Sequence, residues 1–280
     1  MPRSLPRALR SRTAAPLLAL GLALSLLAGC TDDTTPPADG SEEVDTEAGS
    51  VEVPELGACR VLTPDDIPEP TNGDEKVDCS EEHTAETFAV GELPDRLDDA
   101  AYDDAALGAF AYDTCSRAFE KFLGADESLA LRTLLSWAWF RPTKEAWDDG
   151  ARWYRCDVVG GDETSQELLA LPETAKGVML ERGDDRYLAC VKGDSVPGAP
   201  RVPCSEPHDW RAVTTIVVGD EKDPYPGDRV VEVTSRDYCD DSVSAWLDYP
   251  LEYTFAYTWF HEAEWKAGNR RSICWARTDQ

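Results

Sequence analysis

The sequence predicts an α+β fold built from two similar disulfide-stapled halves, each a mostly antiparallel sheet with one packed helix. The motif Val-Asp-Cys-Ser-Glu-Glu-His at 77–83 recurs as Val-Pro-Cys-Ser-Glu-Pro-His at 202–208. Each copy runs into a segment of β-prone residues, at 86–90 and 212–218. Eight cysteines also divide into four for each copy of the motif. They are Cys59, Cys79, Cys115 and Cys156, then Cys190, Cys204, Cys239 and Cys274.

Composition places the chain among folded globular proteins and makes nucleic acid a poor partner. Of 280 residues, 42% are apolar and 9% aromatic, enough for a sizeable core. Lys and Arg total 27 against 55 Asp and Glu, a formal net charge of −28. A phosphate backbone needs a basic footprint, so we expect no nucleic-acid partner.

Residues 1–29 are typical of an export signal, because a basic stretch with four arginines precedes the apolar run 14–28. That run is too short to span a bilayer as a helix. The sequence Leu27-Ala28-Gly29-Cys30 resembles a bacterial lipobox, which implies cleavage before Cys30 and attachment of diacylglyceryl and fatty acids such as palmitate to it. We therefore expect a lipoprotein on the extracytoplasmic face of the membrane. The alternative is an ordinary signal peptide that happens to end in cysteine.

A disordered acidic tether is expected over 30–54, since this stretch is rich in Asp, Glu, Thr, Pro, Gly and Ser and has few residues that could build a core.

The eight cysteines of an exported chain favour disulfides over zinc. The Cys79/His83 and Cys204/His208 pairs could each supply two zinc ligands. The other cysteines of each half are not clustered in pairs, which suits bridges that close long loops, so we expect no metal. Four cysteines allow three pairings in each half, and the sequence leaves them open. We favour first with second and third with fourth, namely Cys59–Cys79, Cys115–Cys156, Cys190–Cys204 and Cys239–Cys274.

The elements follow the same order in the first half (55–160) and the second (183–278), which a connector (161–182) joins; its residues 177–180 are a further candidate strand. Each half opens with a strand, at 57–62 and 187–192, then turns, the motif and its strand. A helix follows, beginning as early as Asp95 in the first half and shorter in the second, after 230–233. Its core face repeats at i, i+4, i+7 and i+8: Cys115, Phe119, Phe122 and Leu123, then Cys239, Val243, Trp246 and Leu247.

An aromatic hairpin closes each half. The strands 135–140 and 255–260 both end in Trp-Phe, and turns closed by Gly150 and Gly268 lead to return strands that carry the last cysteine. Counting back from that cysteine, Trp147 and Trp265 lie nine residues before it, and Arg152 and Arg270 four before it.

The repeated motifs, the helix cysteines and the Trp…Gly-x-Arg…Cys ends resemble the septum-formation domain family of actinobacterial exported and membrane proteins. The resemblance covers about 55–278. It implies a role associated with cell division or the septal envelope, and no reaction, cofactor or defined ligand. Many members are held by transmembrane segments, whereas we expect this chain to rely on a lipid.

The motif histidines are the first candidates for chemistry, since a histidine beside a carboxylate can act as a general acid or base. Glu86 lies three residues after His83, but Arg211 takes that place after His208. We therefore expect both histidines to order their loops. The alternative is a hydrolase of cell-wall polymer that uses His83 and nearby carboxylates. No other catalytic motif is recognisable, and we expect no cofactor.

The aromatic strands are the remaining candidate for function. Tryptophans could line a glycan-binding surface, with Trp147 and Trp265 beside Arg152 and Arg270 as the preferred positions, or they could form the core of each sheet. The sequence thus predicts a non-enzymatic, lipid-anchored envelope module that binds an unknown protein or cell-wall partner.

Overall fold

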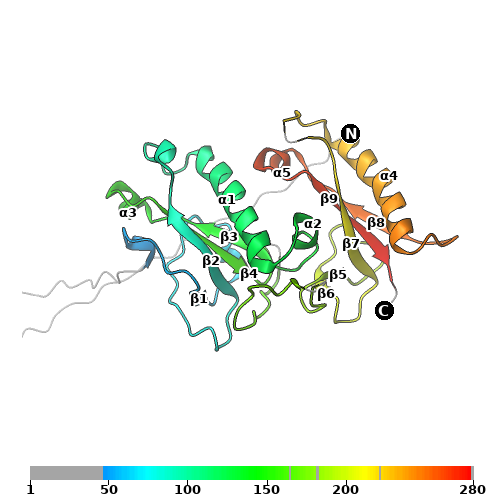
Figure 1. Ribbon diagram of the computed structural model, residues 1–280, viewed down its shortest axis with the longest axis horizontal. Coiled ribbons are helices and arrows are strands. Elements are labelled where there is room, and N and C mark those ends of the chain that lie inside the picture. The colour runs from blue at the N-terminus through cyan, green and yellow to red at the C-terminus, as the bar shows by residue number, and fades with distance from the viewer. Residues whose placement is uncertain (1–46, 164, 181–182, 221, 279–280) are drawn as a thin grey trace, which may run out of the picture. The chain divides into compact units, whose positions relative to one another are not determined.

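Two antiparallel sheets form the framework, one in each predicted half (Figure 1). The computed structural model describes residues 47–163, 165–180, 183–220 and 222–278. The expected signal peptide, the lipidation site Cys30 and the tether up to residue 46 lie outside the described residues. The α+β class and its two disulfide-stapled halves are confirmed.

The two sheets have equivalent strand orders. The first runs β1-β2-β4-β3, with β1 at Cys59–Arg60, β2 at Ala85–Glu92, β4 at Trp153–Val159 and β3 at Ser136–Phe140. The second runs β6-β5-β7-β9-β8, with β6 at Arg201–Pro203, β5 at Ala189–Val191, β7 at Trp210–Val217, β9 at Arg271–Arg277 and β8 at Phe255–Thr258. The extra strand β6 has a counterpart in the first half, where Val77 forms a single bridge with Cys59.

The halves also share their register, including one irregularity. In the first sheet Thr87 pairs with Asp157 and Ala89 with Cys156, so Phe88 is the extra residue of a β-bulge. In the second sheet Ala212 pairs with Trp275 and Thr214 with Cys274, which places the bulge at Val213. A bulge at the same aligned position in both copies supports a duplicated unit.

One long helix packs on each sheet, α1 (Ala105–Leu123) against β2, β3 and β4, and α4 (Asp228–Trp246) against β7, β8 and β9 (Figure 1). The Asp104 side chain caps α1 by accepting from Ala106 N, and Gly124 ends the helix at φ 73°, a left-handed conformation that glycine adopts without strain. As expected, the buried face of α1 contains Cys115, Phe119 and Leu123.

Three expectations about these helices are wrong. The first helix does not begin at Asp95, because Pro94 and a separate 3-10 turn (η3, Asp95–Leu97) precede α1. The second is not shorter, since both helices have 19 residues and α4 begins at Asp228, ahead of the apolar residues expected to precede it. Trp246 is 49% exposed rather than in the core, because it stands at the end of α4, whose buried face is formed by Val231, Ser235, Cys239 and Val243.

The predicted hairpins contain a short helix in place of a tight turn. In the first half α3 (Lys144–Asp148) joins β3 to β4, and the hydroxyl of Thr143 caps it by accepting from Ala146 N. In the second half α5 (Glu262–Ala267) joins β8 to β9, with the Glu264 side chain accepting from His261 N. These capping side chains stabilise the first turn of each short helix, which explains why the two connections are helical.

The connector does not add the strand expected at 177–180, which forms a turn. Its main-chain N–H groups instead serve the end of α1, where helix carbonyls lack partners of their own. Gly177 N donates to Phe122 O and Met179 N to Leu123 O. Met179 is also buried in the core of the first half, so the connector covers the C-terminal end of α1.

Four disulfides join the cysteines in the favoured pairing, Cys59–Cys79, Cys115–Cys156, Cys190–Cys204 and Cys239–Cys274. The second and fourth tie α1 to β4 and α4 to β9, with Cα atoms 5.8 and 5.1 Å apart. The other two close the loops that precede the motif. By the chain-entropy estimate each stabilises the fold by about 3–4 kcal/mol.

The first half contains a buried charge network that the second half lacks. Arg60, Arg155 and Asp157 are fully buried, and Arg155 Nε lies 3.0 Å from Asp157 Oδ2. Thr87 Oγ1 accepts from Arg60 and donates to Asp157 Oδ1. Burial, followed by the neighbouring Arg155 cation, lowers the pKa of Arg60. The aligned positions of the second half are apolar and belong to one core cluster: Val191, Ala212, Ile273 and Trp275.

Glu47 completes this network from a segment expected to be tether. Its Oε1 accepts from Arg60 Nη2 at 2.5 Å and from Arg155 Nη1 at 2.9 Å. Ala48 is buried, and Ser50 O accepts from the indole of Trp153. The tether predicted to reach residue 54 is therefore too long, because residues from Glu47 onward join the first half to neutralise its buried arginines.

We predict that Glu47→Gln lowers the free energy of unfolding by about 2–3 kcal/mol, because two buried guanidinium groups would then share one carboxylate. Chemical denaturation of the purified protein measures this. Glu52→Gln is the matched control, since Glu52 is an exposed acid of the same segment and should change stability by less than about 0.5 kcal/mol. Equal, small effects of both substitutions would contradict the network.

Candidate functional site

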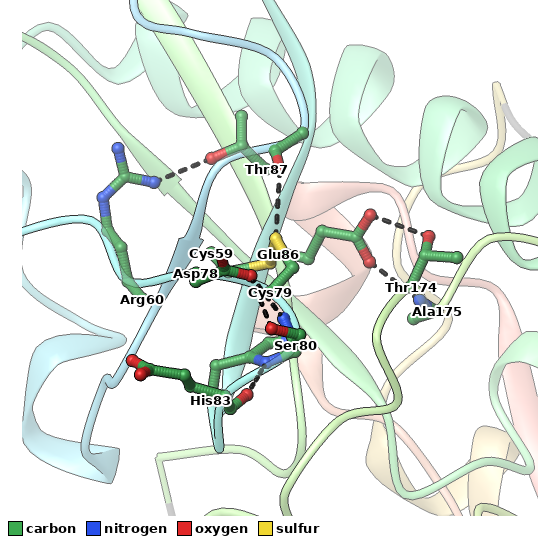
Figure 2. Close-up of a disulfide and its surroundings, with 12 residues drawn as sticks. Cys59, Arg60, Asp78, Cys79, Ser80, His83, Glu86, Thr87, Thr174 and Ala175 are labelled. Carbon is green, nitrogen blue, oxygen red and sulfur yellow. Dashed lines mark hydrogen bonds between the residues drawn. A yellow bond between two sulfur atoms is a disulfide. The ribbon is translucent and has the colours of Figure 1, made fainter.

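The repeated motif forms a corner beside the first disulfide of each half, Cys59–Cys79 and Cys190–Cys204. Figure 2 draws the corner of the first half. In the first half Val77 N donates to Cys59 O, and Cys79 then bonds back to Cys59. Asp78 turns the chain between them, because its Oδ1 accepts from the N–H and the hydroxyl of Ser80. These two bonds, the backbone one first, lower the pKa of Asp78. A main-chain bond also closes this turn, since Glu81 N donates to Asp78 O. Pro203 replaces Asp78 in the second half, where Glu206 N donates to Pro203 O in the same way.

Each motif histidine is buried and bound to its own loop. His83 and His208 are 1% and 4% exposed, and their Nδ1 atoms lie 2.8 Å from the main-chain oxygens of Glu81 and Glu206. A carbonyl oxygen can only accept, so Nδ1 carries a hydrogen in both residues. Within the described part of the chain neither Nε2 has a hydrogen-bond partner. The geometry agrees with the loop-ordering role expected for both residues.

His83 and Glu86 do not form a hydrogen-bonded dyad among the described residues. Both oxygens of the buried Glu86 carboxylate bind the connector, one accepting from Thr174 Oγ1 at 2.8 Å and the other from Ala175 N at 2.7 Å (Figure 2). Figure 2 draws this carboxylate extending toward the connector and away from the imidazole. Glu86 therefore fastens the connector to the first sheet.

Arg211, aligned with Glu86, has a similar task. Its Nη2 lies 2.5 Å from Asp185 Oδ1, in the segment that leads from the connector into β5. Glu86 and Arg211 thus carry opposite charges at aligned positions. Glu86 binds the connector at Thr174 and Ala175, and Arg211 binds Asp185, just after the connector.

The preferred binding surface at Trp147 and Trp265 is wrong, because both rings are 4% exposed and cannot present a face to a glycan. Arg152 covers Trp147 with its guanidinium carbon 4.1 Å from the ring centroid, and Arg270 covers Trp265 at 3.6 Å. Arg152 Nη1 also donates to Trp147 O, and Arg270 makes the same bond to Trp265 O. The four residues therefore form two matching structural clamps that close the hairpins.

A cavity of about 560 Å³ lies where the two halves meet, a size typical of ligand sites. We call it the inter-half cavity; it is lined among others by Leu129, Arg132, Leu188, Arg211, Val213 and Trp246. His208 also lines it, whereas His83 does not. The sequence did not predict this site, because its walls come from segments about 80 residues apart whose proximity depends on how the halves pack. In the sequence, Arg132, which follows α2 (Glu127–Ala130), was the only residue that could have pointed to this cavity.

Among the described residues, no cluster of three or more His, Cys, Asp or Glu side chains could hold a metal ion. No helix within the described ranges has the length and apolar character needed to cross a membrane.

The paired sheets, the matching disulfides and the repeated corners define a tandem α+β module. The sequence profile described as "Septum formation" matches the chain twice, over 30–141 and 132–274. The chain belongs to the septum-formation family, as its motifs indicated. Searches of curated proteins and of solved structures found no match.

We predict that His83→Ala and His208→Ala each lower the free energy of unfolding by about 2–3 kcal/mol, because each leaves a cavity and an unpaired carbonyl. His83→Asn should recover part of this, since the amide can donate from nearly the position of Nδ1. Thermal and urea denaturation measure the effect, with the exposed His261→Ala as the control. Wild-type stability in both alanine variants would contradict a loop-ordering role.

Proposed function

We propose that this protein is a lipid-anchored module on the extracytoplasmic face of the cell membrane, where it takes part in septum formation by binding a protein or cell-wall partner without catalysing a reaction. Family membership supports the septal role. The sequence Leu27-Ala28-Gly29-Cys30 supports the lipid anchor.

The absence of catalysis is proposed because the polar side chains of the repeated motif are bound to the protein's own backbone and connector. His83 and His208 bind their own loops, and the nearby Glu86 carboxylate binds the connector. A general base must reach a proton of its substrate, and a histidine only 1% exposed is poorly placed to do so. The residues that could act chemically thus have structural partners instead.

The anchor and the folded region are joined at a defined point. The roughly 16 residues between Cys30 and Glu47 would span about 20–25 Å on average if they behave as a flexible coil. Because Glu47 pairs with Arg60 and Arg155, that span would be measured from the first half itself. The module would then work close to the membrane surface.

Localisation in growing cells tests the septal role. A fluorescent protein fused to the C-terminus should concentrate at division sites, and deletion should delay or misplace septa. Cys30→Ser should release the fusion from the membrane fraction. A uniform membrane signal together with normal division in the deletion strain would overturn the septal role.

A second assay tests the absence of catalysis. Purified protein incubated with peptidoglycan should release no soluble product over hours. Turnover that disappears in His83→Ala but persists in His261→Ala would favour a hydrolase and overturn this part of the proposal.

A further inference from the structure

The inter-half cavity contains a fixed positive charge. Arg132 Nε donates to Ser128 O at 3.0 Å and its Nη1 donates to Val213 O at 3.0 Å, so its guanidinium bridges α2 and β7. The main chain of Arg132 is held as well, since its carbonyl accepts from Ala189 N at the start of β5. Both main chain and side chain are thus positioned before any ligand arrives.

Within the described part of the chain no carboxylate forms an ion pair or a hydrogen bond with Arg132, and the Asp126 carboxylate acts on it through charge alone. The two acceptors of Arg132 are neutral carbonyl oxygens, and its Nη2 has no acceptor among the described residues. Burial is the largest influence and lowers the pKa of Arg132; the Asp126 carboxylate comes next and raises it, and the Arg211 cation lowers it further. A partly buried guanidinium without an anion in direct contact is costly, and such charges are normally paired.

The second arginine of the cavity is already neutralised. Arg211 pairs with Asp185, and its side chain is 24% exposed. Of the two cavity arginines, Arg132 is thus the one that is not in an ion pair among the described residues, on a chain whose formal net charge is −28. A single carboxylate matches that charge, whereas a phosphate monoester brings about −1.5 to −2 at neutral pH.

Besides the two arginines, the lining contains two polar residues, His208 and Thr278, and an apolar group made of Leu129, Leu188, Ala212, Val213 and Trp246. Leu188 and Val213 are almost fully buried, Leu129 is partly buried, and Trp246 exposes about half of its surface. A ligand would thus place its carboxylate at Arg132 and a small apolar group against these apolar side chains. The last residue of a peptide presents both groups on a single carbon atom.

We propose that the inter-half cavity binds the free carboxyl end of a peptide whose last residue is small and apolar. The peptide could be the end of a cell-wall peptide or of a protein, which share this chemistry. This inference deepens the proposed function, on which it rests for the class of partner.

Isothermal titration calorimetry on the purified mature protein tests the proposal. The probes are N-acetyl-Ala-Ala as the L,L and the D,D acid, the corresponding C-terminal amides, and inorganic phosphate. We expect saturable binding of at least one acid, with its amide and phosphate at least roughly tenfold weaker because both lack the matched charge. Preference for the D,D acid identifies a wall peptide as the source, and preference for the L,L acid a protein terminus.

Arg132→Gln should weaken binding of the acid roughly tenfold or more. Because Arg132 also joins the halves, Arg211→Gln is a second variant: it removes a positive charge from another wall of the cavity and should weaken binding in the same direction. Arg186→Gln is the matched control, since Arg186 is exposed, pairs with Asp184 and does not line the cavity. It should leave binding unchanged.

Three results would overturn the proposal: neither acid binds saturably, the acid binds no more tightly than its amide or phosphate, or both Arg132→Gln and Arg211→Gln bind as the wild type does. None of these results depends on where the protein lies in the cell. A failure of the septal role in the localisation experiment is therefore distinguishable from a failure of this site.

Discussion

The covalent bond between the helix and the central strand is the constraint on which each half depends. Cys115 and Cys239 lie on the buried faces of α1 and α4, and their partners Cys156 and Cys274 lie on β4 and β9. Each strand cysteine pairs with the residue that follows the β-bulge. The position of the helix and the register of the sheet are therefore fixed at one point in both copies, and the remaining core packs around it.

From this shared frame the two halves have diverged in what they bury. The first buries two arginines with Asp157 and obtains another carboxylate from Glu47, next to the expected tether. Removing one partner of such a network is costly, whereas replacing the whole network with apolar residues is often neutral or stabilising. The second half shows that replacement, with Ile273 and Trp275 at the aligned positions. The first half is thereby bound to the segment that begins at Glu47, and the second supplies most of the inter-half cavity.

Much of this fold follows from the sequence, because its signals are local or repeated. The helix cysteines with their apolar neighbours predict an amphipathic helix, and two aligned copies of the motif identify the corners. Comparison of the copies also favours a structural role for His83 over a catalytic one, since Glu86 has no equivalent after His208. The ends of elements are less predictable. Val230 and its neighbours have β-branched side chains typical of a strand, yet they lie in α4 because helix packing outweighs that preference.

What the sequence could not supply depends on distant contacts. Glu47 and Arg155 are 108 residues apart, and nothing near Glu47 distinguishes it from the other acids of its segment. The rings of Trp147 and Trp265 are compatible with either a surface or a core until the arginines that cover them are placed. The position of the Arg132 guanidinium could not be predicted, because it depends on a hydrogen bond to Val213 O, 81 residues away.

The disulfide connectivity tests this account most directly. Proteolysis of the unreduced protein followed by mass spectrometry should recover four linked peptide pairs, joining Cys59 to Cys79, Cys115 to Cys156, Cys190 to Cys204 and Cys239 to Cys274. All four would then vanish on reduction. A link between a cysteine of the first half and one of the second, or free thiols at Cys115 and Cys156, would contradict two separately stapled copies of one fold.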